Sequence, residues 1–147
     1  MVRARERNGP KRKPGTSAPS EVAAGVYVGG WKEAISFQGA RFCVLDEAPA
    51  GMPEATHLPI YDGVRDQADV RNLDRLADLA RRARAKGQPV LFFCGHGVRR
   101  SPLAAAWYLH RTERIPLEQA YERIRAVRPR VESAGEWIGD VTNLRGD

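Results

Sequence analysis

The chain has 147 residues, 42% of them hydrophobic and 29% charged, which is the composition of one globular domain with a core of its own. No apolar run approaches the roughly 20 residues that a membrane-spanning helix needs, and the charged N-terminus lacks the apolar segment of a secretory signal, so we expect no membrane contact and a cytoplasmic location. The two cysteines, Cys43 and Cys94, are too few for a disulfide framework or a cysteine-based zinc site.

The net charge of +6 is concentrated at the N-terminus. Residues 1–20 hold six basic side chains and one acidic side chain, many Pro, Gly and Ser residues, and almost no large apolar ones. This composition predicts a disordered basic tail, followed by a catalytic domain over residues 21–147. The tail is most simply a solubilising terminus, with contact to nucleic acid or an acidic partner as the alternative.

The first part of the domain predicts short strands and one short helix. The run GVYVGG, residues 25–30, indicates a strand closed by a turn, and residues 31–38 indicate a short helix. Residues 40–46 form an apolar strand pattern, and residues 48–55 are typical of a loop. Residues 56–62 predict a strand at the edge of the sheet, because a proline inside it cannot donate to a neighbour.

A long amphipathic helix and a buried strand follow. Apolar residues recur at three- and four-residue spacing through residues 67–87, which predicts a helix that ends at Gly87. The run PVLFFC, residues 89–94, is apolar at successive positions. This pattern favours a central strand of a parallel sheet, covered on both faces.

Helices dominate the remainder of the chain. Residues 101–111 predict a helix, with Ser101 as its N-cap and Pro102 in its first turn. Further helices are expected at residues 116–127 and 134–144. The alternation of strands and helices predicts an α/β domain with a mostly parallel central sheet flanked by helices.

The segment CGHGVRRS, residues 94–101, joins the buried strand to the next helix. Ligands of open α/β sheets bind beyond the carboxyl ends of the strands, where Cys94 is expected to lie. Glycines in the loop let successive N–H groups turn inward around an anion, and the helix N-terminus adds partial positive charge. Arg100 adds a planar fork of donors that suits phosphate, so the segment predicts a phosphate pocket with a cysteine at its base.

This pocket also predicts a reaction. Cationic groups and helix N-termini favour the thiolate form of a cysteine, and phosphoryl transfer needs positioning and neutralisation of charge. We therefore expect Cys94 to be a nucleophile, rather than a structural cysteine at a strand end, and Arg100 to stabilise the transition state. The residues expected to bind phosphate are Gly95, His96, Gly97, Val98, Arg99 and Arg100.

The loop resembles the C-x-x-G-x-x-R-S signature of cysteine-dependent protein phosphatases of the protein-tyrosine phosphatase superfamily, especially the dual-specificity type. The segments GVYVGG, ARFCVLD, HLPIYD and AVRPRV resemble the same family in the same order, over about residues 22–144. The resemblance implies a dual-specificity phosphatase-like fold without metal or cofactor. It also implies hydrolysis of phosphate monoesters through a phosphocysteine intermediate, with phosphotyrosine and phosphoserine or phosphothreonine proteins as substrates.

A phosphate ester needs an acid to protonate its leaving group. In the family this acid is an aspartate upstream of the cysteine, and Asp62, directly after HLPI, matches it best. Asp66 and Asp69 are nearby substitutes. The resemblance also implies that Ser101 assists departure of the thiolate in the second step, whereas His96 either contacts substrate or fills the rim of the loop.

The chain departs from the family at several positions. The usual histidine before the cysteine is Phe93, which leaves a phosphate-binding pseudophosphatase as an alternative, and Glu132 and Ser133 stand where a Pro-Asn pair is common. The C-x-H-G part of the loop resembles RNA 5′-triphosphatases, so an RNA 5′-phosphatase is a second alternative. Some relatives protect the nucleophile with a second cysteine; Cys43 is either that partner or a small core residue.

Overall fold

The computed structural model describes residues 18–52, 54–60 and 68–138 and contains a five-stranded sheet in the order β1-β2-β5-β3-β4. The strands are β1 (Ser20–Ala23), β2 (Val26–Gly30), β3 (Ala40–Cys43), β4 (Thr56–His57) and β5 (Val90–Cys94). Strand β1 is antiparallel to β2, and the other three pairings are parallel. The predicted α/β fold with a mostly parallel sheet is therefore confirmed.

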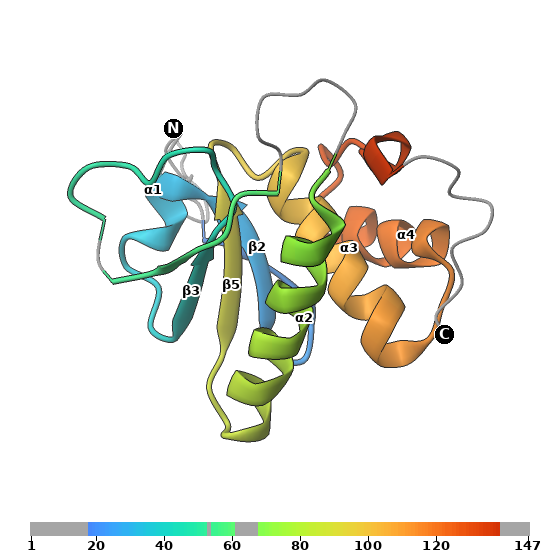
Figure 1. The fold of residues 1–147 in the computed structure, drawn as a ribbon, viewed down its shortest axis with the longest axis horizontal. Coiled ribbons are helices and arrows are strands. Elements are labelled where there is room, and N and C mark those ends of the chain that lie inside the picture. Colours follow the sequence, from blue (N-terminus) through green and yellow to red (C-terminus); the bar gives the residue numbers. More distant parts are fainter. Residues whose placement is uncertain (1–17, 53, 61–67, 139–147) are drawn as a thin grey trace, which may run out of the picture.

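Helices lie on both faces of this sheet (Figure 1). They are α1 (Trp31–Ala34), α2 (Val70–Ala85), α3 (Arg100–Glu113), α4 (Leu117–Val127) and the 3-10 turn η1 (Gly135–Ile138). The larger apolar cluster joins the sheet to α2, α3 and α4, and a smaller one lies on the α1 side. None of the helices in the described part of the chain has the length and apolar character to cross a bilayer.

Strand β5 is the centre of the sheet, as its unbroken apolar sequence predicts. All five of its residues are buried, and its neighbours β2 and β3 run parallel to it. Gly30 at the end of β2 is paired with Cys94 at the end of β5. Because β3 also ends at this edge, the residues after three parallel strands meet there, which is where an α/β sheet binds its ligands.

Several predicted boundaries were wrong. The antiparallel strand β1 starts at Ser20, inside the predicted tail; with only four residues, half of them polar, it gives little strand signal. The predicted helix over 31–38 is a single turn that ends at Ala34, and the strand over 40–46 ends at Cys43. In place of a helix from 134 the structure has the turn η1, and the rest of that segment lies outside the described residues, as do residues 1–17 of the tail.

Helix α2 ends near the predicted stop at Gly87, but it begins at Val70 instead of residue 67. The Asp69 side chain accepts a hydrogen bond from Asn72 N at 3.1 Å, which makes Asp69 the N-cap. Gly87 follows the helix with φ +83°, a left-handed conformation that glycine adopts without strain. The buried residues of the helix match the predicted apolar positions, apart from the exposed Val70 at its first position; they are Leu73, Leu76, Ala77, Ala80 and Ala83.

Replacing the N-cap of α2 should destabilise the fold. We expect Asp69→Ala to lower the free energy of unfolding by about 1 kcal/mol, because Asn72 N loses its acceptor. Asp69→Asn keeps an acceptor oxygen and should retain most of the stability. Urea denaturation measures both variants, and equal loss in the two would contradict the capping role.

Candidate active site

Cys94 ends β5 at the base of a short loop that leads into α3 (Figure 1). Its Sγ atom accepts a hydrogen bond from Gly97 N at 3.3 Å and lies 3.2 Å from the hydroxyl oxygen of Ser101. Only 4% of Cys94 is exposed. The sulfur is therefore surrounded by polar groups of its own loop, an arrangement that can stabilise a negative charge on it.

The carbonyl groups of this loop bond to neighbouring segments. Trp31 N, after β2, donates to Gly95 O at 3.4 Å, and Glu132 N, after α4, donates to Val98 O at 2.9 Å. When successive carbonyls are bound from outside, the N–H groups of the loop are left for its inner side. Such a run of inward N–H groups is a concavity that can hold an anion.

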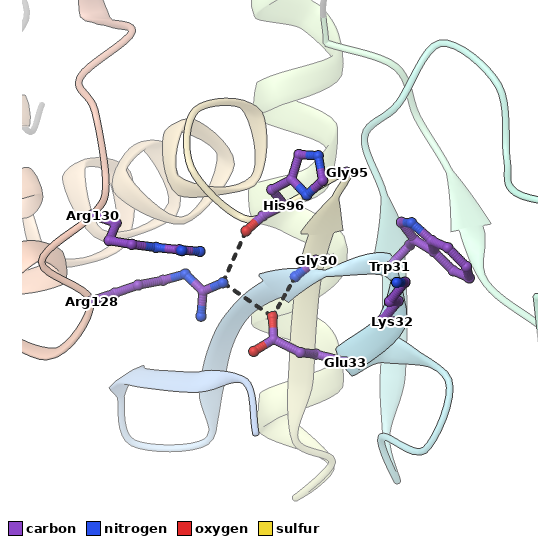
Figure 2. Close-up of a pocket in the computed structure, with 8 residues that line it drawn as sticks. All are labelled: Gly30, Trp31, Lys32, Glu33, Gly95, His96, Arg128 and Arg130. Carbon is purple, nitrogen blue, oxygen red and sulfur yellow. Dashed lines mark hydrogen bonds and ion pairs between the residues drawn. The ribbon is translucent and has the colours of Figure 1, made fainter. Parts of the chain in front are cut away.

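Arg128, the C-cap of α4, binds the two carbonyl groups that lie between these, those of His96 and Gly97. Its guanidinium donates to Gly97 O at 2.9 Å and to His96 O at 3.1 Å. The same group forms an ion pair of 3.1 Å with Glu33, whose carboxylate also accepts from Gly30 N at 2.6 Å (Figure 2). Only 11% of the Arg128 side chain and 8% of the Glu33 side chain are exposed, so this pair lies inside the protein behind the loop.

Glycine is required at one loop position and not at another. Gly97 has φ +72°, and a Cβ there would lie 2.5 Å from the Arg128 guanidinium and 2.8 Å from the backbone of Gly29. At Gly95 a Cβ would meet nothing within 4 Å. The close approach of Arg128 therefore depends on Gly97, whereas the structure gives no steric reason for Gly95.

Arg100 is the first residue of α3, at the mouth of the loop. Its guanidinium lies 3.6 Å from the carboxylate of Asp46, and 23% of its side chain is exposed. Asp46 follows β3, so its position beside Arg100 results from the parallel pairing of β3 with β5. No spacing in the sequence links these two residues, and the sequence analysis missed Asp46 for that reason.

The prediction that Ser101 caps α3 was wrong. The N-cap is Arg99, and within the described structure no side chain caps this helix. Ser101 lies in the first turn, fully buried, and its hydroxyl donates to Gly29 O at 3.2 Å. The side chain faces the sulfur of Cys94 instead of the helix end.

Arg99 turns toward η1. Its guanidinium is 3.0 Å from the carboxylate of Glu136 and its central carbon 4.8 Å from the ring centre of Trp137. The carbonyl of Trp137 in turn accepts from Ala68 N at 2.9 Å, just before α2. The turn η1 therefore links the cysteine loop to the start of α2.

A pocket of about 600 Å³ opens over the cysteine. Its lining includes most of the residues predicted to bind phosphate, joined by side chains from other segments: Leu45, Cys94, Gly95, His96, Val98, Arg99, Arg100, Arg130 and Glu132. Asp62 and Asp66 lie outside the described residues. Asp69 is engaged as the N-cap of α2.

Phe93 and Cys43 belong to the opposite face of the sheet from Cys94. Both are buried in the smaller cluster with Leu91, whereas Cys94 belongs to the larger one. Both cysteines are free thiols. This separation does not support a Cys43–Cys94 disulfide, because side chains at successive strand positions point to opposite faces. Burial raises the pKa of the Cys43 thiol, helped by the nearby Cys94 and opposed by a hydrogen bond at Leu45.

Shortening the Arg128 side chain should loosen the loop. We expect Arg128→Lys to speed amide hydrogen exchange in residues 95–99 by about tenfold, because one ammonium cannot serve both carbonyls and Glu33. Exchange in α2 should not change. Arg125→Lys, on the same helix, is the matched control, and unaltered loop protection in Arg128→Lys would contradict the bracing role.

The two cysteines should differ in reactivity. Iodoacetamide at neutral pH is expected to label Cys94 and to leave Cys43 unlabelled, because a raised pKa keeps the Cys43 thiol protonated and burial shields it. Mass spectrometry of the labelled peptides measures this. In urea Cys43 should become reactive, and fast labelling of Cys43 in the native Cys94→Ser protein would refute the expectation.

No protein-family model matches the chain, but curated proteins do. Rat dual specificity protein phosphatase 12 is 28% identical over 154 aligned residues, which cover 90% of this chain and 44% of that protein. Its human counterpart is 35% identical over 68 residues, or 45% of this chain and 20% of that protein. The chain thus spans less than half the length of the curated relatives it matches.

Solved structures share the fold at low sequence identity. Human DUSP28 superimposes with a TM-score of 0.71 and 19% identity, covering 87% of this chain and 96% of that one. The Cydia pomonella PTP-2 phosphatase gives 0.67 and 23%, covering 82% and 85%. A human tyrosine phosphatase-like serine/threonine/tyrosine-interacting protein gives 0.69 and 12%, covering 85% and 93%. The chain is therefore similar in sequence to dual specificity protein phosphatase 12 and shares the fold of the solved dual-specificity phosphatase structures.

Proposed function

We propose that the chain is a metal-independent phosphatase that hydrolyses phosphate monoesters of proteins through a phosphocysteine intermediate. One observation carries this proposal: the buried Sγ atom of Cys94 accepts a hydrogen bond from its own loop, with Arg100 beginning the adjacent helix. A sulfur held this way is placed to attack a phosphorus atom that the same loop binds. The sequence similarity to dual-specificity phosphatases supports phosphoproteins as the substrates.

The loop, the helix and Arg100 would share the phosphate oxygens. Loop N–H groups donate from the inner side, and the first turn of α3 adds the positive end of its dipole. Arg100 supplies two parallel N–H donors, and the phosphate would replace Asp46 as its counter-ion. These donors are fixed before the substrate arrives, which is how a site stabilises charge that develops in the transition state.

The reaction then takes two steps. The Cys94 thiolate attacks phosphorus, an S–P bond forms, the ester P–O bond breaks, and the carboxylic acid of Asp62 gives its proton to the leaving oxygen. In the second step the Asp62 carboxylate takes a proton from water, which attacks phosphorus. The S–P bond breaks, inorganic phosphate leaves, and the thiolate is restored.

The Ser101 hydroxyl can serve the sulfur in both of its states. It carries one hydrogen, which goes to Gly29 O while the oxygen lies 3.2 Å from Cys94 Sγ. When the sulfur becomes a thiolate, rotation about the C–O bond turns that hydrogen to it. Ser101 thereby stabilises the leaving thiolate of the second step.

Phe93 removes a histidine that the family uses to order its loop, and a binding protein is the alternative if this loss abolishes turnover. In this chain the Arg128–Glu33 pair supports the loop from behind, which favours a catalyst. No observation on the described residues favours an RNA 5′-phosphatase. Contact of the basic tail with nucleic acid and the cytoplasmic location stay predictions.

Hydrolysis of para-nitrophenyl phosphate in the presence of EDTA tests the proposal. We expect turnover by the wild type, none by Cys94→Ser, and a kcat lowered by roughly 10²–10⁴-fold in Asp62→Asn because the leaving group loses its acid. Ser101→Ala should slow the second step and accumulate phosphoenzyme. Asp69→Asn is the control for the acid and should keep full activity.

If all these proteins were inactive but bound vanadate tightly, the chain would be a phosphate-binding protein and not a catalyst. Turnover that EDTA abolishes and added metal restores would overturn the metal-independent mechanism. Full activity in Asp62→Asn would remove that residue from the reaction and leave the nucleophile in place.

A further inference from the structure

Asp46 is held beside Arg100 by the segment that follows β3. Val44 N donates to a carbonyl of β5 at 3.1 Å, and a ring nitrogen of His57 in β4 lies 2.6 Å from Leu45 O. The next residue is Asp46, whose carboxylate lies 3.6 Å from the Arg100 guanidinium. Because the backbone just before Asp46 is bonded to two neighbouring strands, its carboxylate is kept at the mouth of the cysteine pocket.

The contact between Asp46 and Arg100 is one that a phosphate can replace. Its length of 3.6 Å exceeds the about 2.7–2.9 Å of a charge-assisted hydrogen bond, and 48% of the Asp46 side chain is exposed. Asp46 can therefore leave Arg100 by turning into solvent, without movement of the backbone. A phosphate carries up to two negative charges near neutral pH and accepts two parallel bonds from a guanidinium, so it displaces the carboxylate.

The loss of Arg100 leaves Asp46 in a different position from the other carboxylates near the cysteine loop. Glu132, which lines the cysteine pocket, lies 4.0 Å from Arg99, and Glu136 lies 3.0 Å from the same guanidinium. Both keep Arg99 when a phosphate enters. Of these three described carboxylates, Asp46 alone is paired with the arginine assigned to the phosphate, so phosphate binding sets an uncompensated carboxylate beside a second negative group.

We infer that Asp46 is an exchangeable counter-ion that selects phosphopeptides with a basic residue next to the phosphorylated residue. In the empty site the Asp46 carboxylate neutralises Arg100. Once the phosphate takes Arg100, the released carboxylate pairs with a lysine or arginine side chain of the substrate. The inference rests on the proposed function, because it names the substrate class of that site.

This exchange distinguishes the substrate from the product. Every phosphate has to displace Asp46, which weakens the binding of inorganic phosphate and of a phosphopeptide alike. A ligand that brings its own cation recovers the loss, because it gives the released carboxylate a new partner. The inorganic phosphate that the reaction forms brings no cation, so it binds less tightly than it would to a site without Asp46.

The test measures binding of phosphotyrosine peptides to the Cys94→Ser protein by fluorescence anisotropy, in the absence of turnover. The peptides are matched in pairs that differ at a single position within two residues of the phosphotyrosine, which holds either arginine or glutamine. We expect the best arginine peptide to bind roughly twofold to fivefold more tightly than its glutamine partner, as for a partly exposed ion pair. Added salt should reduce this advantage, because salt screens exposed charges.

Asp46→Asn in the Cys94→Ser background is the decisive variant. It should abolish the advantage of the arginine peptide, and it should raise the affinity for inorganic phosphate roughly twofold to fivefold, measured by displacement of the glutamine peptide. Glu47→Gln is the matched control, because Glu47 is the next residue, is exposed, and loses the same charge. This control should retain the advantage of the arginine peptide and the phosphate affinity of the parent protein.

Equal affinity for the arginine and glutamine peptides would overturn the inference, as would a preference that survives Asp46→Asn or disappears equally in Glu47→Gln. Weaker binding of inorganic phosphate to Asp46→Asn would also overturn it, since Asp46 would then orient Arg100 for the phosphate instead of competing with it.

Hydrolysis of para-nitrophenyl phosphate by the wild type separates the inference from the proposed function. A protein that hydrolyses it and shows no preference among the peptides has the proposed function without the selection by Asp46. A protein that shows the preference and fails to hydrolyse it selects basic phosphopeptides as a binding protein.

Discussion

The guanidinium of Arg128 bonds to the cysteine loop, to Glu33 in α1 and to Ser20 in β1. A loop that directs its N–H groups inward must turn its carbonyls outward, and a buried carbonyl without a donor costs about 1–3 kcal/mol. Arg128 supplies the donors for His96 and Gly97, and Glu33 neutralises the charge that this brings into the interior. The same arginine reaches Ser20 in β1 at 3.0 Å, so the first strand is bound into the support of the loop.

The central strand connects this support to the core. Alternate residues of β5 enter the two apolar clusters, with Phe92 and Cys94 on the side of α2 to α4 and Leu91 and Phe93 on the side of α1. Such a strand is packed on both faces, so the position of Cys94 at its end is fixed as well. Phe93 is therefore a packing residue here, and the polar support that a histidine could give at this position has to come from other residues.

The turn η1 connects the cysteine loop to the residues just before α2. Arg99 binds Glu136 and lies over Trp137, and the Trp137 carbonyl holds Ala68. Asp69 N also donates to Ile60 O at 2.9 Å, so the residues on either side of the segment that carries Asp62 are tied together. A change at η1 therefore affects both the cysteine loop and Ala68, just before α2.

The sequence alone determined the α/β class, the central place of β5, the end of α2 and the loop from Cys94 to Ser101, because each depends on local apolar patterns, on Gly87 or on one contiguous motif. Only the tertiary structure decided that Ser101 faces the sulfur, that Asp46 lies beside Arg100 and that Arg128 pairs with Glu33. The last of these pairs joins residues 95 positions apart. Such contacts depend on strand order and helix packing, and no spacing along the chain records them.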